Sequence, residues 1–141
     1  MYIKLIYFIT FSLPFFLPLQ AQQITVACLG LSVTYGAGIK DRTISSYPVQ
    51  LQKLLGNNYE VANFGYSGAT LLKNGHKPYW IQNEFKESQE FLPNIVIIHL
   101  GLNDQGNNNW PKYKDEFIAN YLEMILVYKN LPSKPKVLIC K

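Results

Sequence analysis

The chain has 141 residues and a formal net charge of +4, and 48% of its residues are hydrophobic while 16% are charged. This length fits one domain at most, and the hydrophobic fraction allows a real core, which excludes a disordered chain and a disulfide-stapled miniprotein. The basic residues are scattered, with no basic run and no alternation of basic and aromatic residues, so the sequence predicts no nucleic acid partner.

The N-terminal segment has the features of a secretory signal peptide. Met1–Lys4 has one positive charge, Leu5–Leu19 is almost wholly apolar, and Ala21 is a small residue at a plausible cleavage point. A membrane anchor is the alternative, but the apolar run is interrupted by prolines and is shorter than the ~20 residues that span a bilayer. We therefore expect residues 1–21 to be cleaved, residues 22–141 to belong to one domain, and the mature protein to be secreted or periplasmic, with no role for a membrane after cleavage.

Short apolar runs then alternate with helical patterns along the chain. Runs rich in Val and Ile fit parallel strands buried on both faces, at Ile24–Leu29, Tyr59–Phe64, Ile95–Leu100 and Lys136–Cys140. Apolar residues at helical spacing predict the intervening helices, from Ser46 to a stop at Gly56, from about Ile81 to Phe91, and from Tyr113 to Lys129. This order predicts an α/β three-layer sandwich with a parallel, flavodoxin-like sheet and right-handed crossovers.

The two cysteines, Cys28 and Cys140, each lie in a predicted strand. This placement favours small buried hydrophobic residues over a disulfide, and it disfavours a lipid anchor on Cys28. Two distant cysteines also make no zinc motif, so the sequence predicts no metal site.

Three predicted strands end in polar loops that contain glycine, at Gly30–Gly36, Asn63–Thr70 and Gly101–Gly106. Because ligands bind beyond the carboxyl ends of parallel strands, we expect these loops to converge at one edge of the sheet. The glycine spacing fits neither a P-loop nor a dinucleotide fingerprint, which argues against nucleotide binding. Ser32 follows a strand-ending Gly, where a nucleophilic serine can sit on a sharp turn near oxyanion donors; a cap on the next helix is the alternative for this residue.

The same loops resemble the first three sequence blocks of the SGNH, or GDSL-type, esterase and lipase family, in the family's order. They read Gly-Leu-Ser-Val-Thr-Tyr-Gly from Gly30, Asn-Phe-Gly-Tyr-Ser-Gly from Asn63, and Gly-Leu-Asn-Asp from Gly101. The stretch from Ile97 to Asp104, with Asn-Trp-Pro after it, is similar to sialate O-acetylesterases and related carbohydrate acetylesterases. The resemblance extends from about Val26 to Cys140 and implies the SGNH hydrolase fold.

The resemblance also implies roles for particular residues. Ser32 matches the nucleophile, and its backbone N–H matches one oxyanion donor. Gly65 matches the second donor through its backbone N–H, and Asn103 matches the third through its side-chain amide. Asp104 is expected to support the loop by accepting local hydrogen bonds. This chemistry requires neither a metal nor an organic cofactor.

Two features depart from the family pattern. Leu31 stands where the family usually has Asp or Asn, and the Asp-x-x-His block that supplies the catalytic base does not occur. Neither His76, in a polar loop, nor His99, in a strand and expected to pack against a helix, is assigned as the base. We therefore expect the C-terminal part of the domain to be missing from this chain, and the complete gene product to be the competent esterase.

The resulting prediction is a secreted serine esterase that removes O-acetyl groups from carbohydrate, either a sialate or another glycan. Its expected partner is a small-molecule or glycan ester substrate. Aromatic residues in or beside the loops are candidates to stack on a sugar ring, with loop anchoring as the alternative: Tyr66, Tyr79, Trp80 and Trp110. Two other functions stay open, namely a non-catalytic secreted glycan-binding module and a lipid or thioester acylhydrolase of the same family.

Overall fold

The computed structural model describes residues 22–140, so the predicted signal peptide lies outside the described residues. Four parallel strands form one sheet in the order β2-β1-β3-β4, and they are β1 (Ile24–Gly30), β2 (Tyr59–Gly65), β3 (Ile95–His99) and β4 (Lys136–Ile139). Strand β1 lies between β2 and β3 and is buried from Val26 to Gly30. All the predicted strands are present, and the parallel sheet confirms the predicted fold class.

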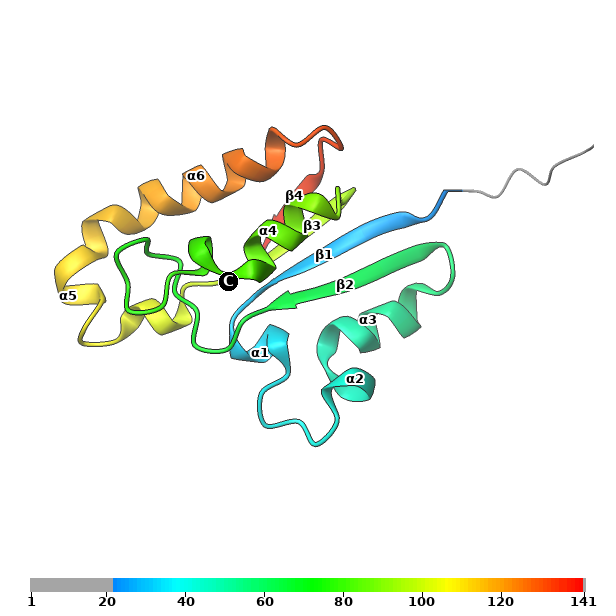
Figure 1. Cartoon of the computed structure of the whole chain (residues 1–141), viewed down its shortest axis with the longest axis horizontal. Helices are drawn as coiled ribbons and strands as arrows, with labels where there is room; N and C mark the ends of the chain where they lie inside the picture. The colour runs from blue at the N-terminus through cyan, green and yellow to red at the C-terminus, as the bar shows by residue number, and fades with distance from the viewer. Residues whose placement is uncertain (1–21, 141) are drawn as a thin grey trace, which may run out of the picture.

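Helices lie on both sides of this sheet (Figure 1). They are α1 (Ser32–Tyr35), α2 (Arg42–Ser45), α3 (Tyr47–Leu55), α4 (Asn83–Glu90), α5 (Trp110–Tyr113) and α6 (Phe117–Lys129), with 3-10 turns η1 (Tyr79–Ile81), η2 (Leu102–Gln105) and η3 (Lys114–Glu116). Helices α1, α2 and α3 lie on the opposite side of the sheet from α6. Helix α4 is joined to α6 by the hydrogen bond between Ser88 Oγ and Tyr128 OH, at 2.6 Å.

The start of one helix differs from the sequence-based expectation. Helix α3 begins after Ser46 and ends at Gly56 as predicted. The helix expected from Tyr113 begins at Phe117, because the short elements α5 and η3 occupy the residues before it. Apolar spacing alone does not separate these short turns from the longer helix that follows them.

The main core lies between the sheet and the helices α4 and α6. Ala27 and Leu29 of β1 and Ile98 of β3 point to this side, where they pack in one cluster with Met124 and Tyr128 of α6. These residues alternate along their strands, as expected because successive side chains of a strand face opposite sides of a sheet.

Helix α3 covers the outer edge of the sheet, which is formed by β2. The Gln52 side chain accepts a hydrogen bond from the Val61 N–H at 2.7 Å and donates one to the Tyr59 carbonyl at 3.0 Å. Both backbone groups belong to β2, whose other edge pairs with β1. A side chain on α3 therefore satisfies the edge of β2 where a further strand would otherwise pair.

The two cysteines have different environments. Cys28 is fully buried, and burial raises the pKa of its thiol to about 11. Cys140 is exposed, so the prediction of a buried side chain is wrong for this residue; it follows β4, which has a strand neighbour on one side only. Both thiols are free rather than paired in a disulfide. No helix within residues 22–140 is long and apolar enough to cross a membrane.

Candidate active site

The loops after β1, β2 and β3 start at the same level of the sheet. Gly30 pairs in register with Gly65 on one side and with His99 on the other, so the carboxyl ends of three strands share one edge. The Tyr66 N–H donates to the Gly30 carbonyl at 2.8 Å, which continues the pairing of β1 and β2 into their loops. These loops leave the sheet at the same end in Figure 1. The predicted convergence therefore holds for the backbone.

Ser32 is the first residue of α1, on the turn that follows β1. It is half-buried, and its hydroxyl has no hydrogen-bond partner among residues 22–140. Leu31, rather than Ser32, occupies the N-cap position, and no side chain caps the helix. The alternative that Ser32 is a helix cap is therefore not supported, and its hydroxyl is free for another partner.

Leu31 stands where the family usually has Asp or Asn, and the turn forms with this apolar residue in place. Its side chain is fully buried and belongs to the main core cluster. Apolar packing therefore fixes the residue before the serine. The Ser32 N–H lies in the first turn of α1, where a helix offers no acceptor of its own.

The structure shows a packing role for Gly65 and an N–H that is not free. Its N–H donates to Asn63 Oδ1 at 2.9 Å and is therefore already engaged. A Cβ atom at this position would lie 2.2 Å from the Tyr35 nitrogen and 2.6 Å from the Thr34 carbonyl carbon. Glycine is required here because β2 and α1 approach each other closely, which is a packing reason.

Three residues further on, Gly68 has the unengaged N–H that an oxyanion donor requires. The Ala69 N–H donates to the Tyr66 carbonyl at 3.1 Å, which closes a four-residue turn. Gly68 has φ +84°, while Ser67 is not among the residues with positive φ, so the turn is of type II, which favours glycine at its third position. The Gly68 N–H has no acceptor among residues 22–140. Sequence reasoning missed this residue, although a Ser-Gly pair in the second block was a usable turn signal.

Asn103 lies in η2, after β3. Its side-chain Nδ2 donates to the Ala69 carbonyl at 2.8 Å, which brings the third loop against the turn that contains Gly68. An amide nitrogen has two N–H groups, so one remains for another acceptor. Its role as an oxyanion donor stays a prediction, but it is adjacent to the second loop, as that role requires.

Asp104 is fully buried, and its carboxylate joins two loops. Its two oxygens accept hydrogen bonds from the Leu71 N–H at 2.9 Å and from the Leu72 N–H at 2.7 Å. Burial raises the pKa of this carboxyl above its usual range, although these amide donors act in the opposite direction. The expected support is present, but its partners lie more than 30 positions away in the sequence and are not local.

Asn109 is a second buried residue that connects the loops by hydrogen bonds, and the sequence analysis did not identify it. Its Oδ1 accepts from the His76 N–H at 2.9 Å, and its Nδ2 donates to the Asn103 carbonyl at 3.0 Å. The same Nδ2 lies 2.9 Å from Nδ1 of His76, whose side chain is exposed. His76 is therefore held by Asn109 in the loop after β2.

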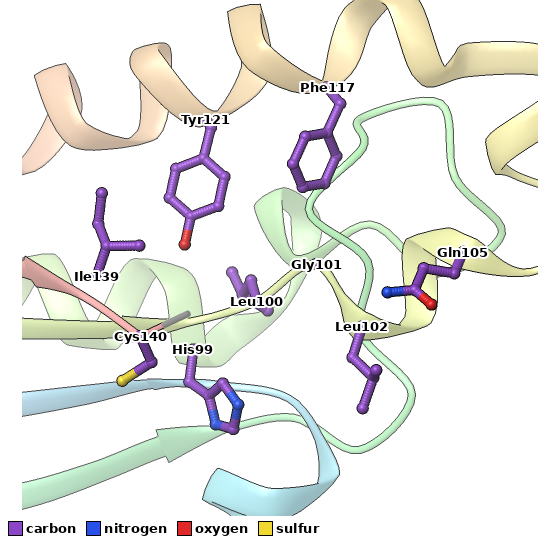
Figure 2. Close-up of a pocket in the computed structure, with 9 residues that line it drawn as sticks. All are labelled: His99, Leu100, Gly101, Leu102, Gln105, Phe117, Tyr121, Ile139 and Cys140. Carbon is purple, nitrogen blue, oxygen red and sulfur yellow. The ribbon is translucent and has the colours of Figure 1, made fainter.

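His99 points to the face of the sheet opposite α6, which is the side on which α1, α2 and α3 lie. It alternates with Ile98, which belongs to the core cluster beneath α6, and in Figure 2 its ring lies on the other side of the strand from Tyr121. The His99 ring has no hydrogen-bond partner within residues 22–140. Neither histidine side chain is hydrogen-bonded to Ser32 within residues 22–140.

Most of the aromatic residues near the loops make contacts that hold the loops in place. Tyr79 is fully buried and donates to the Phe64 carbonyl at 2.6 Å, so stacking on a sugar is wrong for this residue. Trp80 donates to the Leu71 carbonyl at 2.6 Å, and the Lys77 ammonium lies 4.4 Å from the centre of the Tyr66 ring. Trp110 is 39% exposed beside Phe117.

A cavity of about 380 Å³ lies beside this edge, between the end of β3, α6 and the end of β4 (Figure 2). It is lined by His99, Leu100, Gly101, Leu102, Gln105, Phe117, Tyr121, Ile139 and Cys140. Ser32, Gly68 and Asn103 do not line it, so the cavity is separate from the candidate nucleophile. Residues 22–140 contain no group of three His, Cys, Asp or Glu side chains able to hold a metal ion.

The parallel sheet therefore has an unbonded serine hydroxyl on the turn after its first strand, and the next two loops meet at the same edge. The sequence profile of the GDSL-like lipase/acylhydrolase family matches residues 28–140, and the chain belongs to this family.

Individual relatives agree with this assignment. An acetylxylan esterase of Xylanibacter ruminicola is 37% identical in an alignment of 138 positions, which covers 86% of this chain and 28% of that protein. The SGNH-hydrolase esterase AlinE4 has a TM-score of 0.55 and 22% identity over 85% of this chain and 59% of its own. TesA has a TM-score of 0.56 and 24% identity over 82% of this chain and 58% of its own. The chain therefore spans less than two thirds of each of these relatives.

Proposed function

We propose that this chain is the nucleophile-bearing part of a serine esterase that removes acetyl groups from a polysaccharide. The observation that supports this most directly is the unbonded Ser32 hydroxyl at the sheet edge where the second and third loops meet. The family and the acetylxylan esterase relative support the same chemistry.

In the proposed reaction, the Ser32 oxygen attacks the ester carbonyl, and the resulting oxyanion accepts hydrogen bonds from backbone and side-chain amides. The proposed donors are the Ser32 N–H, the Gly68 N–H and Asn103 Nδ2, with Gly68 in place of Gly65. Collapse of the intermediate releases the sugar hydroxyl and leaves an acetyl group on Ser32. Water then attacks this ester, which releases acetate and restores the serine. Loss of one oxyanion donor costs about 100-fold or more in rate.

The proposed base is a histidine encoded after Lys141, which takes the Ser32 proton during the attack and gives it to the departing sugar oxygen. The absence of an Asp-x-x-His block from the sequence supports this placement, as does the partial coverage of the SGNH structures. Apolar side chains on α6 and β4 also lack cover among the described residues, including Leu122 at 56% and Ile139 at 48% exposure. The coding sequence beyond Lys141 tests this directly, since a stop codon there with no such block downstream contradicts the proposed base.

The proposed substrate is an acetylated polysaccharide such as acetylxylan, with an O-acetylated sialate as the alternative. A signal peptide at residues 1–21 is consistent with an extracellular or periplasmic polymer as substrate. We expect the complete gene product, meaning this chain together with any sequence encoded in frame after it, to release acetate from acetylated xylan. It should also hydrolyse p-nitrophenyl acetate about tenfold or more faster than the octanoate ester, because an acyl pocket for acetate excludes a long chain.

The same assay separates the alternatives. Preference for the octanoate ester favours a lipid acylhydrolase, and faster release from O-acetylated sialic acid favours a sialate esterase. Binding to the polysaccharide without acetate release, measured by calorimetry, favours a non-catalytic glycan-binding module. The missing base and Leu31 are the features that keep this last alternative open.

A further inference from the structure

The type II turn Tyr66–Ala69 is held by one lysine from the same loop. Lys77 Nζ donates a hydrogen bond of 2.9 Å to the Ser67 carbonyl, and it also lies over the Tyr66 ring. Lys77 is half-buried, and its own carbonyl accepts from the Thr70 N–H at 2.8 Å, so its backbone is fixed as well. The ammonium therefore contacts this turn at two points, the Ser67 carbonyl and the Tyr66 ring.

The carbonyl that Lys77 binds belongs to the same peptide unit as the Gly68 N–H. Residues 22–140 contain no cis peptide bond, and in a trans peptide the C=O and N–H groups point in opposite directions. A hydrogen bond that fixes the Ser67 carbonyl toward Lys77 therefore fixes the Gly68 N–H on the opposite side. A charged donor also makes this a stronger bond than one between neutral groups, and it polarises the peptide so that the N–H becomes a better donor.

The orientation of this peptide is the feature that distinguishes turn types. Types I and II differ mainly by a flip of the central peptide, here the one between Ser67 and Gly68, which exchanges the directions of its C=O and N–H groups. Gly68 tolerates both conformations because glycine lacks a side chain. A glycine at this position therefore permits the type II turn without enforcing it, and the Lys77 ammonium favours the orientation that is observed.

We propose that Lys77 is a positioning residue that orients the Ser67–Gly68 peptide, so that the Gly68 N–H is a preorganised donor to the oxyanion. This role rests on the proposed function and deepens it. Lys77 acts through the peptide and makes no contact with the reacting atoms. Its effect is therefore on the transition state, in which the oxyanion forms, and not on binding of the uncharged ester.

The test is a Lys77→Met substitution in the complete gene product, with p-nitrophenyl acetate as substrate. We expect kcat to fall about 10- to 100-fold, which is at most the loss expected when one oxyanion donor is removed. KM should change less than about twofold. Lys77→Arg should restore most of kcat, since a guanidinium also donates to the carbonyl. Inhibition by a trifluoromethyl ketone, which forms an oxyanion on the serine, should weaken in parallel with kcat.

Lys73→Met is the matched control. Lys73 comes from the same loop and lies 4.4 Å from the centre of the Trp80 ring, but it pairs with Glu123 and not with the turn. We expect its kcat to be unchanged. Equal losses in both variants, an unchanged kcat in Lys77→Met, or a rise in KM alone overturns the role of Lys77 while the esterase function stands. A wild-type protein without ester hydrolysis instead overturns the proposed function, and the role of Lys77 with it.

Discussion

Replacing Ser32 with alanine is expected to lower the kcat of the complete gene product for p-nitrophenyl acetate by about 10⁴-fold or more, because the nucleophile is lost. The fold should persist, since the Ser32 hydroxyl makes no hydrogen bond within residues 22–140 and does not cap α1. Steady-state hydrolysis and thermal unfolding of the same preparations measure both effects.

Ser45→Ala is the control for this experiment. Ser45 is an exposed serine of α2, and its substitution should leave kcat and the unfolding temperature unchanged. Retention of full activity by Ser32→Ala excludes Ser32 as the nucleophile. A large fall in its unfolding temperature contradicts the interpretation that the hydroxyl has no structural partner.

Replacing Gly65 with alanine is expected to destabilise the fold by about 3 kcal/mol or more. The added Cβ would lie within 2.6 Å of two backbone atoms of α1, and backbone has no alternative rotamer with which to move away. Because Gly65 pairs with Gly30 in the register of β1 and β2, relief of the overlap requires α1 or the end of β2 to shift. The free energy of unfolding from urea titration measures the loss.

Gly106→Ala provides the matched comparison. Gly106 has φ −61°, and a Cβ there would have its nearest neighbour at 3.7 Å, an ordinary contact. This substitution should change the free energy of unfolding by about 0 to 1 kcal/mol, in the stabilising direction, because alanine restricts the unfolded chain. If Gly65→Ala is as stable as Gly106→Ala, the interpretation that β2 and α1 approach each other too closely for a side chain at Gly65 is wrong.

The sequence predicted the parts of this fold that depend on local pattern. The apolar runs around Val26 and Val96 mark strands because β-branched residues fill a sheet buried on both faces. The position of Ser32 after Gly30 could also be predicted, since the carboxyl ends of parallel strands are where such folds place their sites.

The contacts that join the loops could not be predicted in the same way. Asp104 bonds to Leu71 and Leu72, and Asn109 to His76, across separations of more than 30 residues that no periodicity encodes. The proposal of Gly68 rather than Gly65 as a donor depends on which N–H is already engaged, and only the structure shows that the Asn63 side chain accepts from the Gly65 N–H. Tyr79 illustrates the same limit, because its burial follows from the path of the loop and not from its neighbours in the sequence.

The central claim is that the Ser32 oxygen forms the covalent acyl intermediate. The most direct measurement is to label the complete gene product with a fluorophosphonate, which reacts with activated serines, and to locate the adduct by peptide mass spectrometry. We predict one adduct on Ser32, and no adduct in the Ser32→Ala variant. An adduct on a different residue, or none from a preparation that hydrolyses acetate esters, would contradict the assignment.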